Sequence, residues 1–241
     1  MIGAFIDSAG ILLGGLCALT IKKPIAARYQ LAIKVALGAY TVWFGLQLTW
    51  KSLNGSFGQI LKELCIVLLA MAVGKLTGAA LRLQEFSNSV GQFANRALAG
   101  AETKTNRQFS DGFVVATGLF CVGPLALLAS VQEGLNGFSP MFIVKAVMDG
   151  LATMAFCSTL SWGAIVSAVP VLAFQGLIIR GMQLLEPGFH HQPWPLLDAV
   201  NATDGLLIFC VALIILEVKK VRVADYLPSL IFAPLLMRWL W

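Results

Sequence analysis

The chain has 241 residues, of which 58% are hydrophobic and only 12% are charged, and its mean hydropathy is +0.82. Soluble globular domains carry about 25% charged residues, so this composition excludes that class and is typical of a polytopic membrane protein. The formal net charge of +5 is explained by basic residues in the loops between apolar segments. We therefore expect the lipid bilayer as the surrounding medium and no nucleic-acid partner.

Apolar segments long enough to cross a bilayer follow one another along the chain. A helix needs about 20 mostly apolar residues to span roughly 30 Å of hydrocarbon. An eighth segment at 224–241 is weaker because it is short and holds Pro228 and Pro234, and a re-entrant or interfacial piece is the alternative there. The sequence predicts an all-α integral membrane protein with seven or eight transmembrane helices in one domain over 1–241. The seven firm segments are 3–21, 32–50, 60–80, 109–131, 140–160, 163–185 and 199–217.

Basic residues predict the orientation of these segments. Cytoplasmic loops carry an excess of lysine and arginine, and here the most basic loops follow the first, third and seventh segments. We therefore expect these loops in the cytoplasm and the N-terminus outside. The first segment lacks a basic n-region and a small-residue cleavage site, so it is expected to be a retained helix. The basic residues concerned are Lys22, Lys23, Arg28, Arg82, Arg96, Lys104, Arg107, Lys219, Lys220 and Arg222.

Residues 81–108 form the only long polar stretch. Apolar residues recur there at three- and four-residue steps, which predicts an amphipathic helix. We expect this helix to lie on the cytoplasmic leaflet as a linker between the two halves of the chain, and a docking site for a partner protein is the alternative. The apolar positions are Leu83, Phe86, Val90, Phe93 and Ala97.

Three short motifs recur in the same order in the two halves of the chain. An even number of spans in each half makes such repeats parallel, related by an axis along the membrane normal. The pattern predicts a duplication of four plus four segments. The paired motifs are FIDSAGILLGG at 5–15 with VMDGLATMAFC at 147–157, FGLQL at 44–48 with RGMQL at 180–184, and LFCVGPLALL at 119–128 with LIFAPLLM at 230–237.

Two apolar segments contain prolines that are expected to break the helix, at Gly123-Pro124 and at Pro170. Proline removes a backbone donor and clashes with the preceding turn, so a carbonyl near Phe120 loses its helical partner. In lipid that carbonyl must be satisfied by neighbours, water or an ion. Broken helices of this kind form substrate and cation sites in transporters, and a plain proline kink is the alternative.

Charged residues inside the apolar segments are the strongest functional signal. A charge near the bilayer centre costs roughly 2.5–3.5 kcal/mol on insertion scales. Lys145 and Asp149 are one helical turn apart and are expected to pair. The functional interpretation is a carboxylate that responds to protons or cations, with a lysine counter-ion, whereas a self-satisfied pair that fixes helix packing is the alternative. Asp204, beside Asn201, is interpreted in the same way. Asp7, Asp111 and Asp198 are expected at the membrane interface.

Catalytic, metal and cofactor motifs are lacking in the sequence. It contains neither G-x-S-x-G nor H-E-x-x-H, and its two histidines, His190 and His191, lie in one predicted loop. We therefore expect no enzyme, no metal site and no cofactor. The cysteines fall in different apolar segments and are expected to be packing residues. They are Cys17, Cys65, Cys121, Cys157 and Cys210.

Several of these segments resemble a known family. LFCVGPLALLASVQEGLNG at 119–137 and KAVMDG at 145–150 are similar to signature segments of the YqgA/YdfK-type bacterial membrane proteins. STLSWGAIVSAVPVLAFQG at 158–176 and KKVRVADYLPS at 219–229 fit the same pattern, so the resemblance covers nearly the whole chain. It implies a multi-pass protein of the bacterial inner membrane, in a family of unknown function that is usually labelled as transport protein.

These observations predict a small secondary transporter or an ion-conducting protein, with a site between the halves near the midplane. Carboxylates and carbonyls would replace the hydration of a cation, or Lys145 would meet an anionic group of a solute. The alternatives are a non-transporting scaffold or sensor that acts through 81–108 and, less favoured, an intramembrane enzyme built on Asp149 and Asp204. The expected partners are a small solute or ion and a second copy of the chain. The expected site residues are Asp149, Lys145, Asp204, Asn201, Gln175, Gly123, Pro124 and Phe120.

Overall fold

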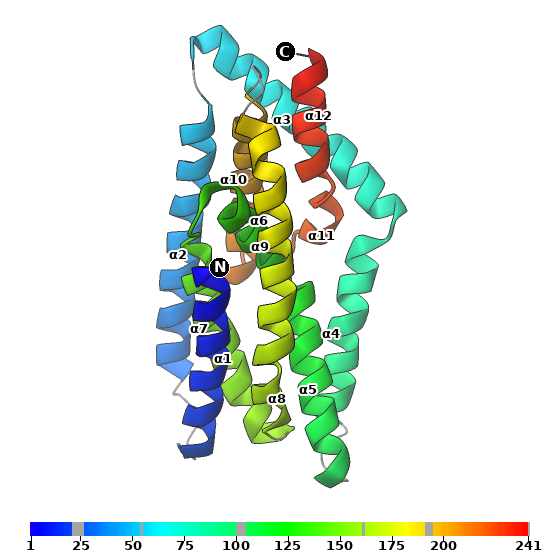
Figure 1. Ribbon diagram of the computed structural model, residues 1–241. Helices are drawn as coiled ribbons and strands as arrows, with labels where there is room; N and C mark the ends of the chain where they lie inside the picture. Colours follow the sequence, from blue (N-terminus) through cyan, green and yellow to red (C-terminus); the bar gives the residue numbers. More distant parts are fainter. Residues whose placement is uncertain (21–26, 54, 100–104, 161, 191–194, 241) are drawn as a thin grey trace. The chain divides into compact units, whose positions relative to one another are not determined.

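The computed structural model describes residues 1–20, 27–53, 55–99, 105–160, 162–190 and 195–240, and every regular element in them is an α-helix (Figure 1). Six helices are long and apolar enough to cross a bilayer, and two bent helix pairs pass the same test together, so these residues hold six to eight candidate spans. The predicted all-α membrane class is confirmed. Val223–Leu240, the weakest segment in the sequence, is one of the six.

The chain divides into two compact units, each built from two stretches of sequence. Unit 1 contains Met1–Ala27 and Phe86–Met182, and unit 2 contains Arg28–Glu85 and Gln183–Trp241. The single membrane domain over 1–241, the orientation and the four-plus-four repeat stay predictions. Among the residues used for these predictions, Lys22, Lys23 and Lys104 lie outside the described ranges, as does His191. His190 is the last residue of a helix, so the loop predicted at that position was wrong.

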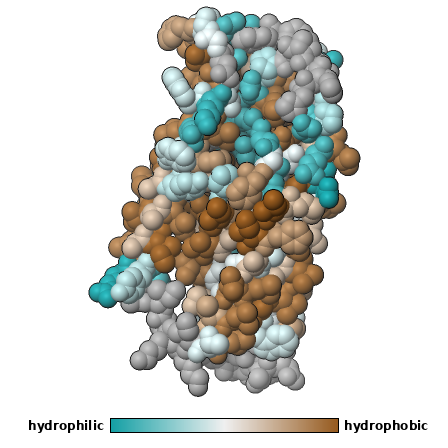
Figure 2. Space-filling model, turned by 60° about the vertical axis from the view of Figure 1, so that its left-hand side comes forward, coloured by the Kyte–Doolittle hydropathy of each residue, from teal (hydrophilic) through white to brown (hydrophobic). Residues whose placement is uncertain are grey.

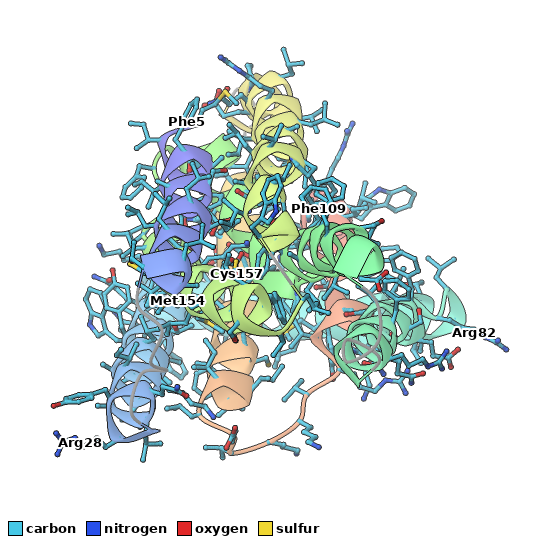
Figure 3. The ribbon with its side chains drawn as sticks, turned by 90° about the horizontal axis from the view of Figure 1, so that it is seen from below. Phe5, Arg28, Arg82, Phe109, Met154 and Cys157 are labelled. Atoms are coloured by element: carbon cyan, nitrogen blue, oxygen red, sulfur yellow. The ribbon has the colours of Figure 1, made fainter. Side chains whose placement is uncertain are left out.

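Unit 1 is organised around the contact between its first helix, α1 (Ile2–Thr20), and α7 (Met141–Thr159), which lie side by side (Figures 1 and 3). The two helices run in the same direction, since Gly10 of α1 lies against Ala146 and Gly14 lies against Gly150. A side chain at Gly14 would collide with the carbonyl oxygen of Gly150, so only glycine permits this approach. The other helices of unit 1 are α5 (Thr105–Val122), α6 (Pro124–Asn136), α8 (Gly163–Val166), most of α4 (Leu83–Ala99) and the first part of α9 (Ala168–His190).

Both helix breaks predicted from prolines fall in unit 1, and one of them is observed. α5 ends at Val122, and α6 begins at Pro124 after a bend of 54°. Proline is favoured at the first helical position because its missing N–H has no partner there in any case. The sixth segment is a single candidate span over Gly163–Pro187, in which only Ser167, with right-handed helical dihedrals, separates α8 from α9. The predicted interruption of the fourth segment is therefore confirmed, whereas the break predicted at Pro170 is not found.

Unit 2 also contains close helix contacts at glycines, but its paired helices run in opposite directions. Gly38 of α2 lies against Leu216, and Gly45 lies against Gly205 of α10. α3 packs on the C-terminal helices in the same antiparallel way, with Gly74 beside Ser229. The helices of unit 2 are α2 (Ala27–Ser52), α3 (Phe57–Ala80), the end of α9, α10 (Leu196–Ile215), α11 (Val223–Tyr226) and α12 (Ser229–Leu240).

The amphipathic segment predicted within 81–108 is helical over Leu83–Ala99, which is α4. α4 follows α3 after a short junction, in which Arg82 has a positive φ of 55°. Phe86 and Phe93 of α4 are exposed. The helix is confirmed, whereas its position on the cytoplasmic leaflet stays a prediction.

Large apolar side chains are exposed over much of the surface that Figure 2 displays in brown. Phe5 and Leu13 of α1, Trp50 of α2 and Leu177 of α9 each expose more than half of their surface, and Phe5 lies on the outer side of α1 in Figure 3. In water such a surface would be costly, whereas lipid tails solvate it well. These side chains are the lipid-contacting surface of the protein.

Candidate functional site

Four polar side chains from three helices meet in the interior of unit 1. They are Asp7 of α1, Lys145 and Asp149 of α7, and Gln175 of α9, and we call them the unit 1 cluster. The Nζ of Lys145 donates to Asp7 Oδ2 at 2.7 Å and also donates to Asp149 Oδ2. The Nε2 of Gln175 donates to the same oxygen of Asp7 at 2.6 Å. The predicted pairing of Lys145 with Asp149 is thus present, and Asp7 and Gln175 extend it.

The local sequence explains why these side chains meet. Lys145 and Asp149 are separated by four residues and share one face of α7. The close contact of Gly10 with Ala146 holds α1 against α7 and brings Asp7, one turn before Gly10, within reach of Lys145. Small residues at this contact are what allow two backbones to approach so closely.

Asp7 corrects the sequence analysis. It was expected at the membrane interface, but its side chain is fully buried and ion-paired, so that expectation is wrong. The lysine that neutralises Asp7 lies 138 residues away along the chain, which no local pattern indicates. Asp111 and Asp198, which were predicted to be interfacial in the same way, are partly exposed.

The charges of the unit 1 cluster do not balance. Two carboxylates share one ammonium, and the fourth member is a neutral amide. With both carboxylates ionised, the cluster carries a net charge of −1 in a buried place, where a charge is costly. Oδ1 of Asp7 and Oε1 of Gln175 have no hydrogen-bond partner among the described residues. The cluster therefore has the charge and the free oxygens to take up one more positive charge.

Phe120 contributes its ring to this region. The Lys145 Nζ lies 5.9 Å from the centre of the Phe120 ring, within reach of a cation–π contact. Phe120 also belongs to the apolar core of unit 1 and lies 6.1 Å from the ring of Phe156. Gly123 and Pro124 form the break between α5 and α6 that follows Phe120. The use of a freed carbonyl near this break as a ligand stays a prediction.

Glu133 is a buried acid that the sequence analysis missed. It lies on α6, and its two carboxylate oxygens accept the N–H of Gly3 at 2.9 and 3.1 Å. A carboxylate at the start of a helix satisfies a free N–H and complements the helix dipole. Glu133 is the only charged residue between Asp111 and Lys145, and that isolation was the available signal.

Asp204 lies in unit 2, on α10, and its surroundings differ from those of the unit 1 cluster. Its side chain is 0% exposed, and neither carboxylate oxygen has a hydrogen-bond partner in the part of the chain that the structure describes. Asn201, one turn earlier on the same helix, is buried as well. Because Asp149 and Asp204 belong to different units, a single site shared by both stays a prediction.

Within the described residues, no group of three or more His, Cys, Asp and Glu side chains is placed to hold a metal ion. The unit 1 cluster itself consists of two carboxylates, one amine and one amide.

Comparison with known proteins identifies the family. A family model described as "Protein of unknown function (DUF554)" matches residues 2–238. The chain belongs to this family. It is similar to the uncharacterized membrane protein YdfK of Bacillus subtilis (strain 168), with 26% identity over 238 residues that cover 98% of this chain and 96% of the relative. It is also similar to the uncharacterized protein YqgA of Escherichia coli (strain K12), with 25% identity over 241 residues that cover 99% and 97%.

No solved structure matches the chain. The resemblance that the sequence motifs indicated is confirmed, and the protein is a membrane protein of a family without an assigned function.

Proposed function

We propose that this membrane protein moves a small ion or solute across the bilayer and that the unit 1 cluster is the place where charge is exchanged. One observation carries the proposal: a fully buried carboxylate, Asp7, and a partly buried one, Asp149, share the single ammonium of Lys145. A pair that served packing alone would need only one carboxylate. The second one adds a charge that costs roughly 2.5–3.5 kcal/mol on insertion scales unless something neutralises it.

Asp149 is the member of the cluster that is best placed for exchange. Its side chain is 14% exposed, against 4% for Lys145 and 0% for Asp7. A proton or a cation that reaches Asp149 neutralises it and leaves Lys145 paired with Asp7. An anionic solute group would act in the opposite sense, by competing with Asp149 for Lys145. In both cases the set of groups paired with Lys145 changes, and the net charge of the unit 1 cluster changes with it.

The broken helix of the fourth segment supports the same proposal. α5 carries Phe120 to Lys145 just before the break at Gly123, while α9 carries Gln175 into the cluster. Discontinuous helices form the ion and substrate sites of many transporters, because broken backbone leaves polar groups available at membrane depth. One such helix thus contributes to the cluster.

Flux through reconstituted liposomes tests the proposal. Liposomes on a sensor electrode would receive pulses of cations, anions, amino acids and organic acids at several pH values, and a pH-sensitive dye would detect electroneutral exchange. We expect one solute class to give a signal that Asp149→Asn abolishes. Asp111→Asn, which neutralises a partly exposed carboxylate, is the matched control and should keep the signal. Silence of the wild type in both assays, or an unchanged signal in Asp149→Asn, contradicts the proposal.

A scaffold or sensor is the second candidate function. The exposed Phe86 and Phe93 of α4 would suit a partner protein as well as lipid. This function would survive Asp149→Asn and would be lost when both phenylalanines are replaced by serine, which separates it from transport. An enzymatic activity is not part of our proposal. Location in the bacterial inner membrane and assembly as a homodimer remain predictions.

A further inference from the structure

The helices α7 and α10 share a short motif at an acid in their interior, partly buried in α7 and fully buried in α10. Both contain Asp-Gly-Leu, at 149–151 in α7 and at 204–206 in α10. In unit 1 the glycine of the motif, Gly150, lies against the backbone of α1. In unit 2 the corresponding Gly205 lies against the backbone of α2, at Gly45. Each unit therefore holds a buried acid beside a close contact of two helix backbones.

The two helices differ one turn before the acid. α7 carries Lys145 four residues before Asp149, and its ammonium binds that carboxylate. The same position on α10 is Val200, which is buried and apolar. Asp204 is as deeply buried as Asp7, yet neither of its oxygens has a hydrogen-bond partner among the residues described for the chain. An ionised carboxylate in that state is strongly unfavourable without a counter-charge.

Oxygen atoms gather at the contact of α2 with α10, close to residues that precede and follow Asp204 in the sequence. The Thr49 Oγ1 lies 3.0 Å from the carbonyl oxygen of Gly45 and 3.3 Å from that of Ala202, two residues before Asp204. A side chain at Gly205 would touch Thr49 Oγ1 and the Gly45 carbonyl, so the same oxygens flank the residue that follows Asp204. Carboxylate, carbonyl and hydroxyl oxygens together are the ligands that hard cations prefer.

We infer that Asp204 anchors a second cation site, in unit 2, and that a small monovalent cation of the Na⁺ type takes there the place that the Lys145 ammonium holds in unit 1. A monovalent ion is required because a single carboxylate neutralises one positive charge, and a divalent ion would leave an excess charge in the bilayer. A bound proton would neutralise the carboxylate as well, and a dependence of stability on metal cations rather than on pH alone distinguishes the two. Binding of the cation is independent of flux, whereas its role as the coupling ion rests on the proposed function.

Thermal unfolding of the purified full-length protein in detergent tests the site. The unfolding midpoint would be recorded against NaCl, LiCl, KCl and CaCl₂, at a total ionic strength held constant with choline chloride. A ligand that binds only the folded state raises the midpoint in a saturable way. We expect such a rise with one monovalent cation, its loss in Asp204→Asn, and its retention in Asp198→Asn, which changes a partly exposed carboxylate on the same helix.

A second variant supplies the missing counter-ion. Val200→Lys places an ammonium one turn before Asp204, as Lys145 stands before Asp149. Its midpoint should no longer respond to the cation, and the double variant Val200→Lys with Asp204→Asn should be less stable than either single variant. If Val200→Lys does not fold, the comparison of wild type with Asp204→Asn still decides the question.

The outcomes separate this inference from the proposed function. A midpoint that responds to no monovalent metal cation, or responds only to pH, overturns the inference, as does an unchanged response in Asp204→Asn. Cation binding that depends on Asp204 in a protein without flux upholds the site and contradicts transport. Flux that depends on Asp149 in a protein that binds no cation at Asp204 upholds transport and contradicts the cation site.

Discussion

The two units neutralise their buried acids in different ways. In unit 1, helices that run in the same direction place Asp7 and Asp149 on one lysine, so the acids carry a counter-ion within the protein. In unit 2, Asp204 lies on a helix that runs antiparallel to its neighbour, and both its oxygens are without a partner among the described residues. Asp7 and Asp204 are both 0% exposed, so burial alone does not indicate how a membrane protein neutralises an acid.

Unit 2 also contains an acid with a plainly structural role. Asp225 of α11 accepts the backbone N–H of Gln84 at 3.0 Å, and Arg222 lies 2.8 Å from its other oxygen. The Gln84 side chain accepts the N–H of Ala224 at 3.2 Å in return. This reciprocal pair fixes the turn between α3 and α4 to α11. Both oxygens of Asp225 thus have partners, whereas both oxygens of Asp204 have no hydrogen-bond partner among the described residues.

The largest predicted effect comes from removing the counter-ion of unit 1, so that its acids lack a lysine as Asp204 of unit 2 does. Lys145→Met leaves Asp7 and Asp149 without a counter-ion, and removing one partner of a buried ion pair costs about 3–5 kcal/mol. Unfolding in detergent should show this loss, and adding Asp7→Asn and Asp149→Asn should recover much of it. Lys75→Met, which removes an exposed lysine over the Tyr226 ring, is the control and should change stability little. Wild-type stability in Lys145→Met would show that the lysine is no counter-ion.

The second effect concerns the helix contact that assembles the unit 1 cluster. Gly14→Ala forces a methyl group into the carbonyl of Gly150, so α1 must move away from α7, at a cost of about 2 kcal/mol. Gly58→Ala in α3 is the matched control, since a methyl group there meets nothing within 4 Å and alanine favours the helix. Unfolding midpoints should therefore move in opposite directions. A rise of the midpoint in both variants would mean that helix propensity outweighs the contact.

A smaller effect is expected from the structural acid of unit 2. Asp225→Ala leaves the N–H of Gln84 without its acceptor and should lower the free energy of unfolding by about 1 kcal/mol. Glu85→Ala removes an exposed carboxylate 3.8 Å from Arg82 and should change it by less. The comparison of the two midpoints measures how much of the junction depends on Asp225. Equal midpoints in Asp225→Ala and Glu85→Ala would mean that the junction between α3 and α4 does not depend on Asp225 for its stability.

The smallest effect lies at the end of α10. A hydrogen bond from Lys34, together with its positive charge, lowers the pKa of the exposed Glu217 below its ordinary value. Because the folded pKa is the lower one, the pair stabilises the fold above the ordinary value, about 4.3, and that contribution is lost as the pH falls through the folded pKa. Glu217→Gln should therefore be slightly less stable than wild type at pH 6 and equally stable at a pH below the folded pKa of Glu217. Salt should weaken the difference in stability at pH 6. An equal difference at both pH values would exclude the ion pair as its cause.

Sequence reasoning predicted the parts of this molecule that depend on local chemistry. Hydropathy over windows of about 20 residues identified the spans, because lipid requires nearly every residue of a span to be apolar. The backbone chemistry of proline located the break at Gly123-Pro124, and helical periodicity paired Lys145 with Asp149. Each of these inferences needs only residues within a few turns of one another.

The rest of the site depends on which helices are neighbours. Asp7 reaches Lys145, and Gln175 reaches Asp7, because glycine contacts place α1 against α7 and polar side chains then find one another. Hydropathy does not encode these neighbours, since one apolar segment is much like another. Gln175 was predicted from its position after a proline, while Asp7 and Glu133 were placed wrongly or missed. The pairing of distant helices was the missing information.

The long separation of Asp7 from Lys145 has a consequence for how the protein is made. Translation delivers α1, with its acid, 138 residues before the lysine that neutralises it. At about 5–20 residues per second, this interval lasts roughly 7–28 seconds. For that time the first helix carries an unneutralised carboxyl group, and it cannot settle in its final place until α7 has been synthesised. The position of α1 in the fold is therefore fixed only after α7 has left the ribosome.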